Sequence, residues 1–169
     1  MDVMISVRQA YRPDLERSKR MLNEILQAAI ARIGQLLGEG TTVHGTVPEE
    51  GTPKPYAVVG FSEVSEKQMT GPRFLRRNQL HVRYMADMTS EASAAAAYEA
   101  MDLLLEGMRT LTLEDGSLIR GTGLNCKAAE GVLDFFAEYQ MFLVDQPEAD
   151  DNRMGSVEIT GEEFEKSFA

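Results

Sequence analysis

Apolar residues recur at spacings of three and four between Pro13 and Leu37, which indicates an amphipathic α-helix with one buried face. Pro13 suits the first turn, where the missing N–H of proline is not needed, and Gly38 and Gly40 supply the backbone freedom that ends a helix. The sequence therefore predicts a first helix over Pro13–Leu37. Its apolar stripe comprises Leu15, Leu22, Ile25, Leu26, Ala29, Ile30, Ile33, Leu36 and Leu37.

A second helix is predicted from about Ser90 to Met108. Thr89 or Ser90 can cap its N-terminus, and Gly107 lies near its end. The alanines within it would let the helix approach a sheet closely. Its expected apolar stripe comprises Ala94, Ala97, Tyr98, Met101, Leu104, Leu105 and Met108.

Alternation of apolar and polar residues predicts the strands. A tight turn at Glu130 and Gly131 joins the last two strands, and a turn at Glu114 to Gly116 precedes them. The predicted strands are Thr41–Val47, Tyr56–Phe61, Arg77–Met85, Leu118–Ala128 and Val132–Val144. In the last of these, one face carries apolar residues from Leu133 to Leu143 and the other carries Asp134, Glu138 and Gln140.

The polar segment from Ser62 to Phe74, which contains Gly71 and Pro72, is expected to be a long mobile loop between two strands. The order helix, strands, helix, strands predicts a single α+β domain. We expect an antiparallel sheet of about four strands with both helices packed on one face and charges on the other. The domain is expected over residues 21–144, with an N-terminal extension (1–20) and an acidic C-terminal extension (145–169).

Charge and composition argue against several classes of function. The formal net charge is -10, so the chain gains no affinity from neutralising phosphates, and sequence-independent nucleic-acid binding is not expected. The apolar stretches are interrupted well short of the length that spans a bilayer, which predicts a protein that is made in the cytoplasm and does not enter a membrane. A single cysteine, Cys126, forms no internal disulfide and no cysteine metal cluster.

Candidate chemical groups have simpler structural interpretations. His44 and His81 lack metal or catalytic partners at fixed spacing, and His81 and Arg83 are expected to form cross-strand ion pairs with Asp134 and Glu138, although a paired-carboxylate site is the alternative. The run Arg120–Gly123 lacks the lysine and the following helix of a phosphate-binding loop, so its glycines indicate a bulge or a close backbone approach. Cys126 has no activating base nearby. No cofactor or metal is expected.

One group of charged residues beside the predicted loop is rich in arginine, within a chain that is acidic overall. It is either a solvated edge or a surface that pairs with acidic groups of a neighbouring subunit or of another protein. The candidate interface residues are Glu66, Lys67, Arg73, Arg76 and Arg77.

Residues 21–144 resemble the phage tail terminator proteins of tailed phages and prophages of Gram-positive bacteria. The resemblance is carried by Met21–Ile25, by Leu80–Tyr84, by Tyr98–Leu105 and, most specifically, by Gly116–Gly123 followed by Gly131–Phe136. None of these segments is a catalytic motif. The two extensions depart from the family pattern, and their role stays open between disordered ends and segments that reach a neighbouring protein.

The resemblance implies a non-enzymatic subunit of the virion, at the neck end of the tail, made in the cytoplasm of a bacterial host. Such proteins form a ring, usually a hexamer, that caps the head-proximal end of the tail tube, stops its growth and joins the head. The implied partners are other copies of the chain, the tail tube protein and a neck or head connector protein, while DNA passes through the ring without specific binding. The alternatives are another neck, head-closure or tail-completion component, and a small ligand-binding α+β domain.

Overall fold

The computed structural model describes residues 13–145, with side chains described from Met21 onward. These residues form two helices and six strands. In chain order they are α1 (Pro13–Leu37), β1 (Thr42–His44), β2 (Tyr56–Gln68), β3 (Arg73–Met85), α2 (Glu91–Gly107), β4 (Thr110–Thr112), β5 (Leu118–Ala129) and β6 (Val132–Val144). The two expected extensions lie outside the described residues, apart from the helical backbone of residues 13–20 and Asp145.

The six strands form one mixed sheet in the order β1-β2-β3-β6-β5-β4. The α+β class is therefore confirmed, but the expected antiparallel sheet of about four strands is wrong in two respects. β1 pairs parallel with β2, because the loop after β1 returns the chain to the same end before β2 begins. β4 is a further edge strand antiparallel to β5, and its three residues are too few to show a periodic pattern.

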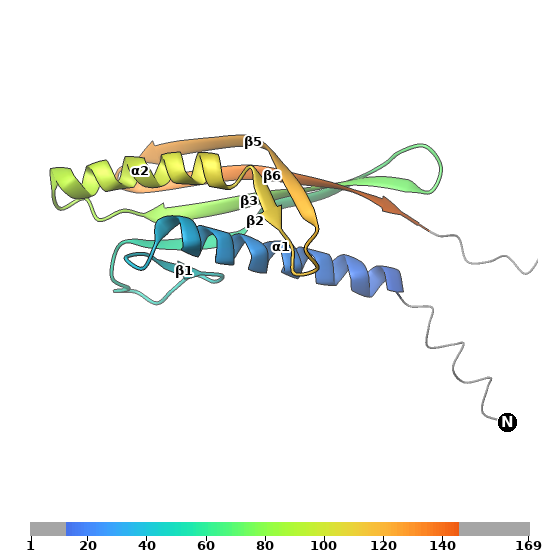
Figure 1. Ribbon diagram of the computed structural model, residues 1–169, viewed down its shortest axis with the longest axis horizontal. Coiled ribbons are helices and arrows are strands. Elements are labelled where there is room, and N and C mark those ends of the chain that lie inside the picture. Colours follow the sequence, from blue (N-terminus) through green and yellow to red (C-terminus); the bar gives the residue numbers. More distant parts are fainter. Residues whose placement is uncertain (1–12, 146–169) are drawn as a thin grey trace, which may run out of the picture.

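Both helices pack on the same face of the sheet, as predicted, and Figure 1 shows them on its near side. The buried stripe of α1 is Ile25, Ala29 and Ile33, and that of α2 is Ala97, Ala100 and Leu104. These stripes meet the apolar face of the central strands, so one continuous core holds the two layers together. The strand residues of this core are Ala57, Val59, Leu80, Val82, Tyr84, Leu133, Phe135, Ala137 and Tyr139.

Local sequence signals define the start of α2 and the turn between β5 and β6. Ser90 caps α2, and its hydroxyl accepts a hydrogen bond from the backbone N–H of Ser93 at 3.2 Å. Glu130 and Gly131 both have positive φ angles, of 49° and 78°, as a two-residue hairpin turn requires.

Tyr98 departs from the predicted apolar stripe, since its position on α2 points away from the sheet and it is 61% exposed.

The segment expected as a mobile loop is instead an ordered hairpin. β2 continues to Gln68 and β3 begins at Arg73, so only residues 69–72 form the turn, and the N–H of Met69 donates to the carbonyl of Arg73 at 2.8 Å. The polar side chains of this segment concealed its strand character, which the cross-strand pairing with β3 supplies. A register shift between Phe61 and Glu63 marks where the hairpin leaves the body of the sheet.

The end of the sheet formed by residues 63–78 and 140–144 is here called the arm. It is three-stranded, because β5 pairs with β6 only as far as Tyr139, and β1 pairs with β2 only as far as Val58. Figure 1 shows it projecting beyond the six-stranded part of the sheet. β3 is paired with β2 on one side and with β6 on the other along the arm, and these two ladders keep it extended.

Gly121 allows a close backbone approach between β5 and the segment that follows α2. Its N–H donates to the carbonyl of Arg109 at 2.8 Å, and the hydroxyl of the buried Tyr139 donates to the carbonyl of Met108 at 2.7 Å. A register shift follows between Thr122 and Asn125. The prediction that the glycines of Arg120–Gly123 serve a bulge and a close approach is thus confirmed.

We predict that Gly121→Ala destabilises the protein by about 1–3 kcal/mol, as over-packing generally does. The added Cβ would lie 2.8 Å from the carbonyl oxygen of Met108 and 3.0 Å from the ring of Tyr139. Urea unfolding measures the effect. Gly60→Ala is the matched control, because a Cβ there meets no atom within 4 Å and should leave the midpoint nearly unchanged. Equal behaviour of the two variants would contradict this account of Gly121.

Candidate functional site

The face of the sheet that the helices leave uncovered carries more basic than acidic residues, although the whole chain has a net charge of -10. The pairing register places these residues on the face opposite the core. Because this face lies away from the helices, its side chains are available to other molecules. Its charged residues in β2, β3, β5 and β6 include the basic Lys67, Arg73, Arg77, Arg83, Arg120 and Lys127 and the acidic Glu63, Asp134 and Glu138.

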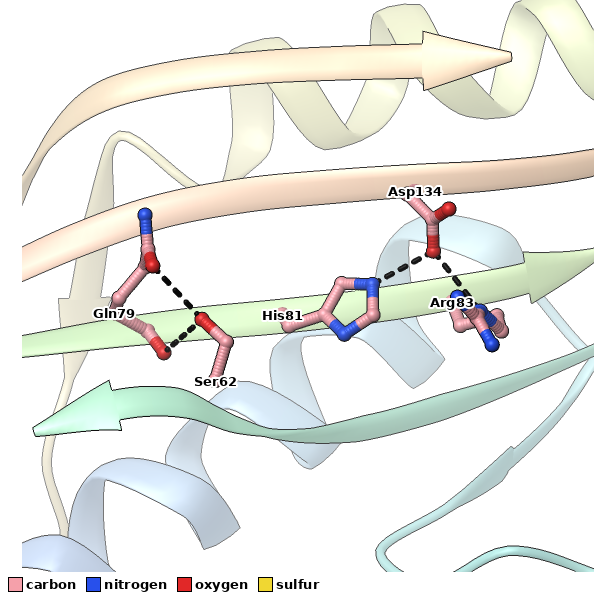
Figure 2. Close-up of polar contacts among 5 residues, drawn as sticks. All are labelled: Ser62, Gln79, His81, Arg83 and Asp134. Atoms are coloured by element: carbon pink, nitrogen blue, oxygen red, sulfur yellow. Dashed lines mark hydrogen bonds and ion pairs between the residues drawn. The ribbon is translucent and has the colours of Figure 1, made fainter. Parts of the chain in front are cut away.

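A polar cluster joins β3 and β6 at the centre of this face (Figure 2). His81 Nε2 donates to Asp134 Oδ1 at 2.7 Å, and Arg83 Nε donates to the same oxygen at 3.0 Å. The His81 ring stacks on Phe136 with centroids 4.7 Å apart, and Lys127 Nζ lies 5.8 Å from the centre of that ring. The predicted cross-strand pairing of His81 and Arg83 with Asp134 is confirmed, whereas Glu138 takes no part in it.

Asp134 is held in its charged form by these contacts. Partial burial raises the pKa of the Asp134 carboxyl, but the hydrogen bonds from Arg83 and His81, together with their positive charges, outweigh burial and lower it. All its partners belong to the same sheet face, so the cluster fixes β3 against β6. Nothing in its geometry presents a reactive group to a substrate.

At the start of the arm, the hydroxyl of Ser62 donates to Gln79 Oε1 at 2.9 Å, and it also lies 3.3 Å from the carbonyl oxygen of Gln79 (Figure 2). These contacts fall at the register shift between β2 and β3. They link β2 to β3 through side chains at the point where the backbone pairing is irregular, so they connect the arm to the body of the sheet at its base.

The outer face of the arm combines positive charge with exposed apolar surface. The register sets Lys67, Leu75 and Phe142 side by side, with Arg73 and Arg77 two residues either way from Leu75 along β3. Leu75 is buried beneath these neighbours, while Phe142 is 71% exposed. An exposed aromatic ring among cations is the kind of surface found at the centre of protein interfaces.

The five residues singled out from the sequence all lie in the arm, but on two faces. Lys67, Arg73 and Arg77 lie on the outer face. Arg76 and Glu66 pair across the strands on the face toward the core side, where Arg76 Nε donates to Glu66 Oε1 at 2.6 Å. The sequence reasoning missed Phe142, although its position on the polar side of an alternating strand was a usable signal.

The other candidate groups form no chemical site. Half-burial raises the pKa of the Cys126 thiol, and the negative charge of Asp102 raises it further, so the thiol is less nucleophilic than a free cysteine. Among residues 21–145, no three His, Cys, Asp or Glu side chains gather as metal ligands. A hollow of about 490 Å³ lies between α1 and the turn after β4. Its walls include Asn23, Glu24, Gln27, Thr112 and Glu114.

Neither described helix is long and apolar enough to cross a membrane.

We predict that Asp134→Asn lowers stability at pH 7 by about 1 kcal/mol, the upper range for exposed ion pairs. The folded pKa of Asp134 lies below its unfolded value of about 3.9, so its contribution is complete above that pH and is lost as the pH falls through the folded pKa. Urea unfolding should therefore show a difference between wild type and variant that shrinks below about pH 4. A difference that persists unchanged in acid would contradict the ion-pair explanation.

Comparison with known proteins gives a family match over most of the chain. The family model described as phage tail terminator protein matches residues 24–151. No curated protein matches the sequence. Among solved structures, a chain from the "Virion of native gene transfer agent (GTA) particle" shares 20% sequence identity, covers 73% of this chain and 94% of its own length, and superposes with a TM-score of 0.35.

That likeness to a solved structure is distant, so the assignment rests on the family model. The model covers both helices from Glu24 onward, all six strands and the arm. The chain therefore belongs to the phage tail terminator protein family and is a structural, non-enzymatic component of a phage virion.

Proposed function

We propose that copies of this chain form a hexameric ring that caps the head-proximal end of the tail tube, stops its growth and provides the surface to which the head joins. The observation that carries the proposal is the arm, an ordered part of the fold that extends beyond the main body and presents Phe142 and three cations outward. These side chains are not part of the hydrophobic core of the subunit, so they do not stabilise its fold through the core.

The proposed partners are other copies of the chain, the tail tube protein and a neck or head connector protein. A subunit that works through its interfaces needs more than one contact surface, and this chain has a helical layer on one side and a charged sheet face on the other. DNA would pass through the ring without specific binding, in keeping with the acidic charge of the chain. Lys67, Arg73, Arg76, Arg77 and Glu66 are proposed to lie in or next to the interface with a neighbouring subunit or the tube.

Two of these residues take an indirect role in the proposal. The ion pair between Arg76 and Glu66 links β3 to β2 within the arm, so these side chains would hold the arm in shape. Lys67, Arg73 and Arg77 are the side chains that a partner would touch. No ion pair joins these three to another residue in the described part of the chain.

We predict that particles made without this protein carry tails of uncontrolled length that do not join heads. Electron microscopy of lysates measures the tail-length distribution and the fraction of heads with tails. Supplying the wild-type protein in trans should restore uniform tails. Tails of normal length joined to filled heads in its absence would refute the proposed function.

A further inference from the structure

The outer face of the arm is built to meet an acidic protein surface. Phe142 supplies a large exposed ring. Arg73 and Arg77 lie diagonally beside it on β3, and Lys67 lies in the same row on β2, beyond Leu75. Arginine can grip a carboxylate with two parallel hydrogen bonds, which fixes orientation as well as adding affinity. The patch therefore favours a partner that offers several carboxylates around an apolar residue.

A surface of that description lies on α2 of the same chain. α2 contains no lysine or arginine, and Glu99, Asp102 and Glu106 recur at the spacing that brings helix residues to one side. All three are exposed, and Leu103 among them is 42% exposed, which is unusual for a leucine in a packed helix. Three carboxylates and an apolar side chain thus match three cations and an aromatic ring.

The two surfaces lie on opposite faces of the sheet, because α2 covers the core face while the cations and Phe142 of the arm lie on the outer face. Complementary surfaces that lie apart on one chain cannot satisfy each other within that chain. They can do so between copies, in a head-to-tail contact that repeats around a ring. We infer that the arm of one copy docks on the Glu99–Glu106 side of α2 of the next copy.

The charge of the arm also argues against DNA as its occupant. A ring through which DNA passes must not retain it, and a row of exposed Lys and Arg side chains in the lumen would bind the phosphates. Docking on an acidic helix covers these cations and removes the difficulty. The inference rests on the proposed ring and assigns the two surfaces that form its subunit contact.

Disulfide trapping tests the contact in assembled tails. Cys126→Ser removes the native thiol, and Leu103→Cys with Phe142→Cys then places one cysteine on each surface. Both positions are exposed, so the fold should tolerate the changes. Mild oxidation of tails carrying this triple variant should give a ladder of covalent oligomers on a non-reducing gel, because each copy can link to two neighbours.

The matched controls carry Cys126→Ser with only one of the two new cysteines. Each control can form at most a dimer, so a ladder that appears only with both cysteines identifies a head-to-tail contact. Absence of the ladder from tails that contain the triple variant would overturn the inference.

Charge exchange provides an independent test. Arg73→Glu with Arg77→Glu, and separately Glu99→Lys with Glu106→Lys, should each reduce the yield of tail-joined heads by at least about tenfold, since like charges would then face each other across the contact. The chain with all four substitutions restores opposite charges and should recover most of the yield. An unchanged melting temperature for each variant shows that the fold is intact.

The outcomes separate this inference from the proposed function. Suppose that Arg73→Glu with Arg77→Glu lowers the yield and the quadruple variant does not recover it. The arm then contacts the tube or connector protein, and the proposed contact between the arm and α2 is wrong, while the terminator role stands. If arm reversal leaves the yield unchanged, the inference is also wrong. The terminator role itself fails only if tails lacking the protein altogether are normal.

Discussion

The full-length pairing of β3 with a strand on each side is the constraint on which the rest of the structure depends. Each of its thirteen residues, from Arg73 to Met85, faces a residue of β6, and β2 accompanies it to Phe74. The β2–β3 and β3–β6 ladders continue past the ends of β1 and β5, so the three central strands extend as an arm that these two ladders hold together. An extension of this kind can carry polar side chains without losing its form.

The same pairing places the apolar residues of the central strands on one face of the sheet and most of their polar residues on the other. On one face the apolar residues of β3 and β6 meet α1 and α2, and the buried Tyr139 and the close approach at Gly121 tie the sheet to the end of α2. On the other face, Asp134 joins His81 and Arg83 across the strands. The core therefore depends on one face alone, which leaves the other free for contacts between molecules.

The elements whose ends are marked by local residues could be predicted from the sequence. The apolar periodicity gave the span of α1, Ser90 gave the start of α2, and Glu130 with Gly131 gave the tight turn. Sequence reasoning failed where pairing overrides local preference. Residues 62–68 lack a buried face that alternation could reveal, and they are a strand because β3 lies beside them.

The candidate surface was only partly visible in the sequence for the same reason. The basic cluster was evident, but adjacent arginines gave no indication that Arg76 would turn to Glu66 on one face while Arg73 and Arg77 turned to the other. Phe142 joins them only through the register between β6 and β3. Residues far apart in the chain form one patch, and this depends on the topology of the sheet.

An acidic chain thus carries a basic sheet face and an acidic helix, and we propose that assembly brings these surfaces together. Oxidative footprinting of Phe142 tests this most directly, with Met88, 50% exposed and remote from the arm, as an internal reference. We expect Phe142 to be readily oxidised in the isolated protein and strongly protected in purified tails, while oxidation of Met88 changes little. Equal oxidation of Phe142 in the isolated protein and in tails would contradict the claim that the arm is an assembly surface.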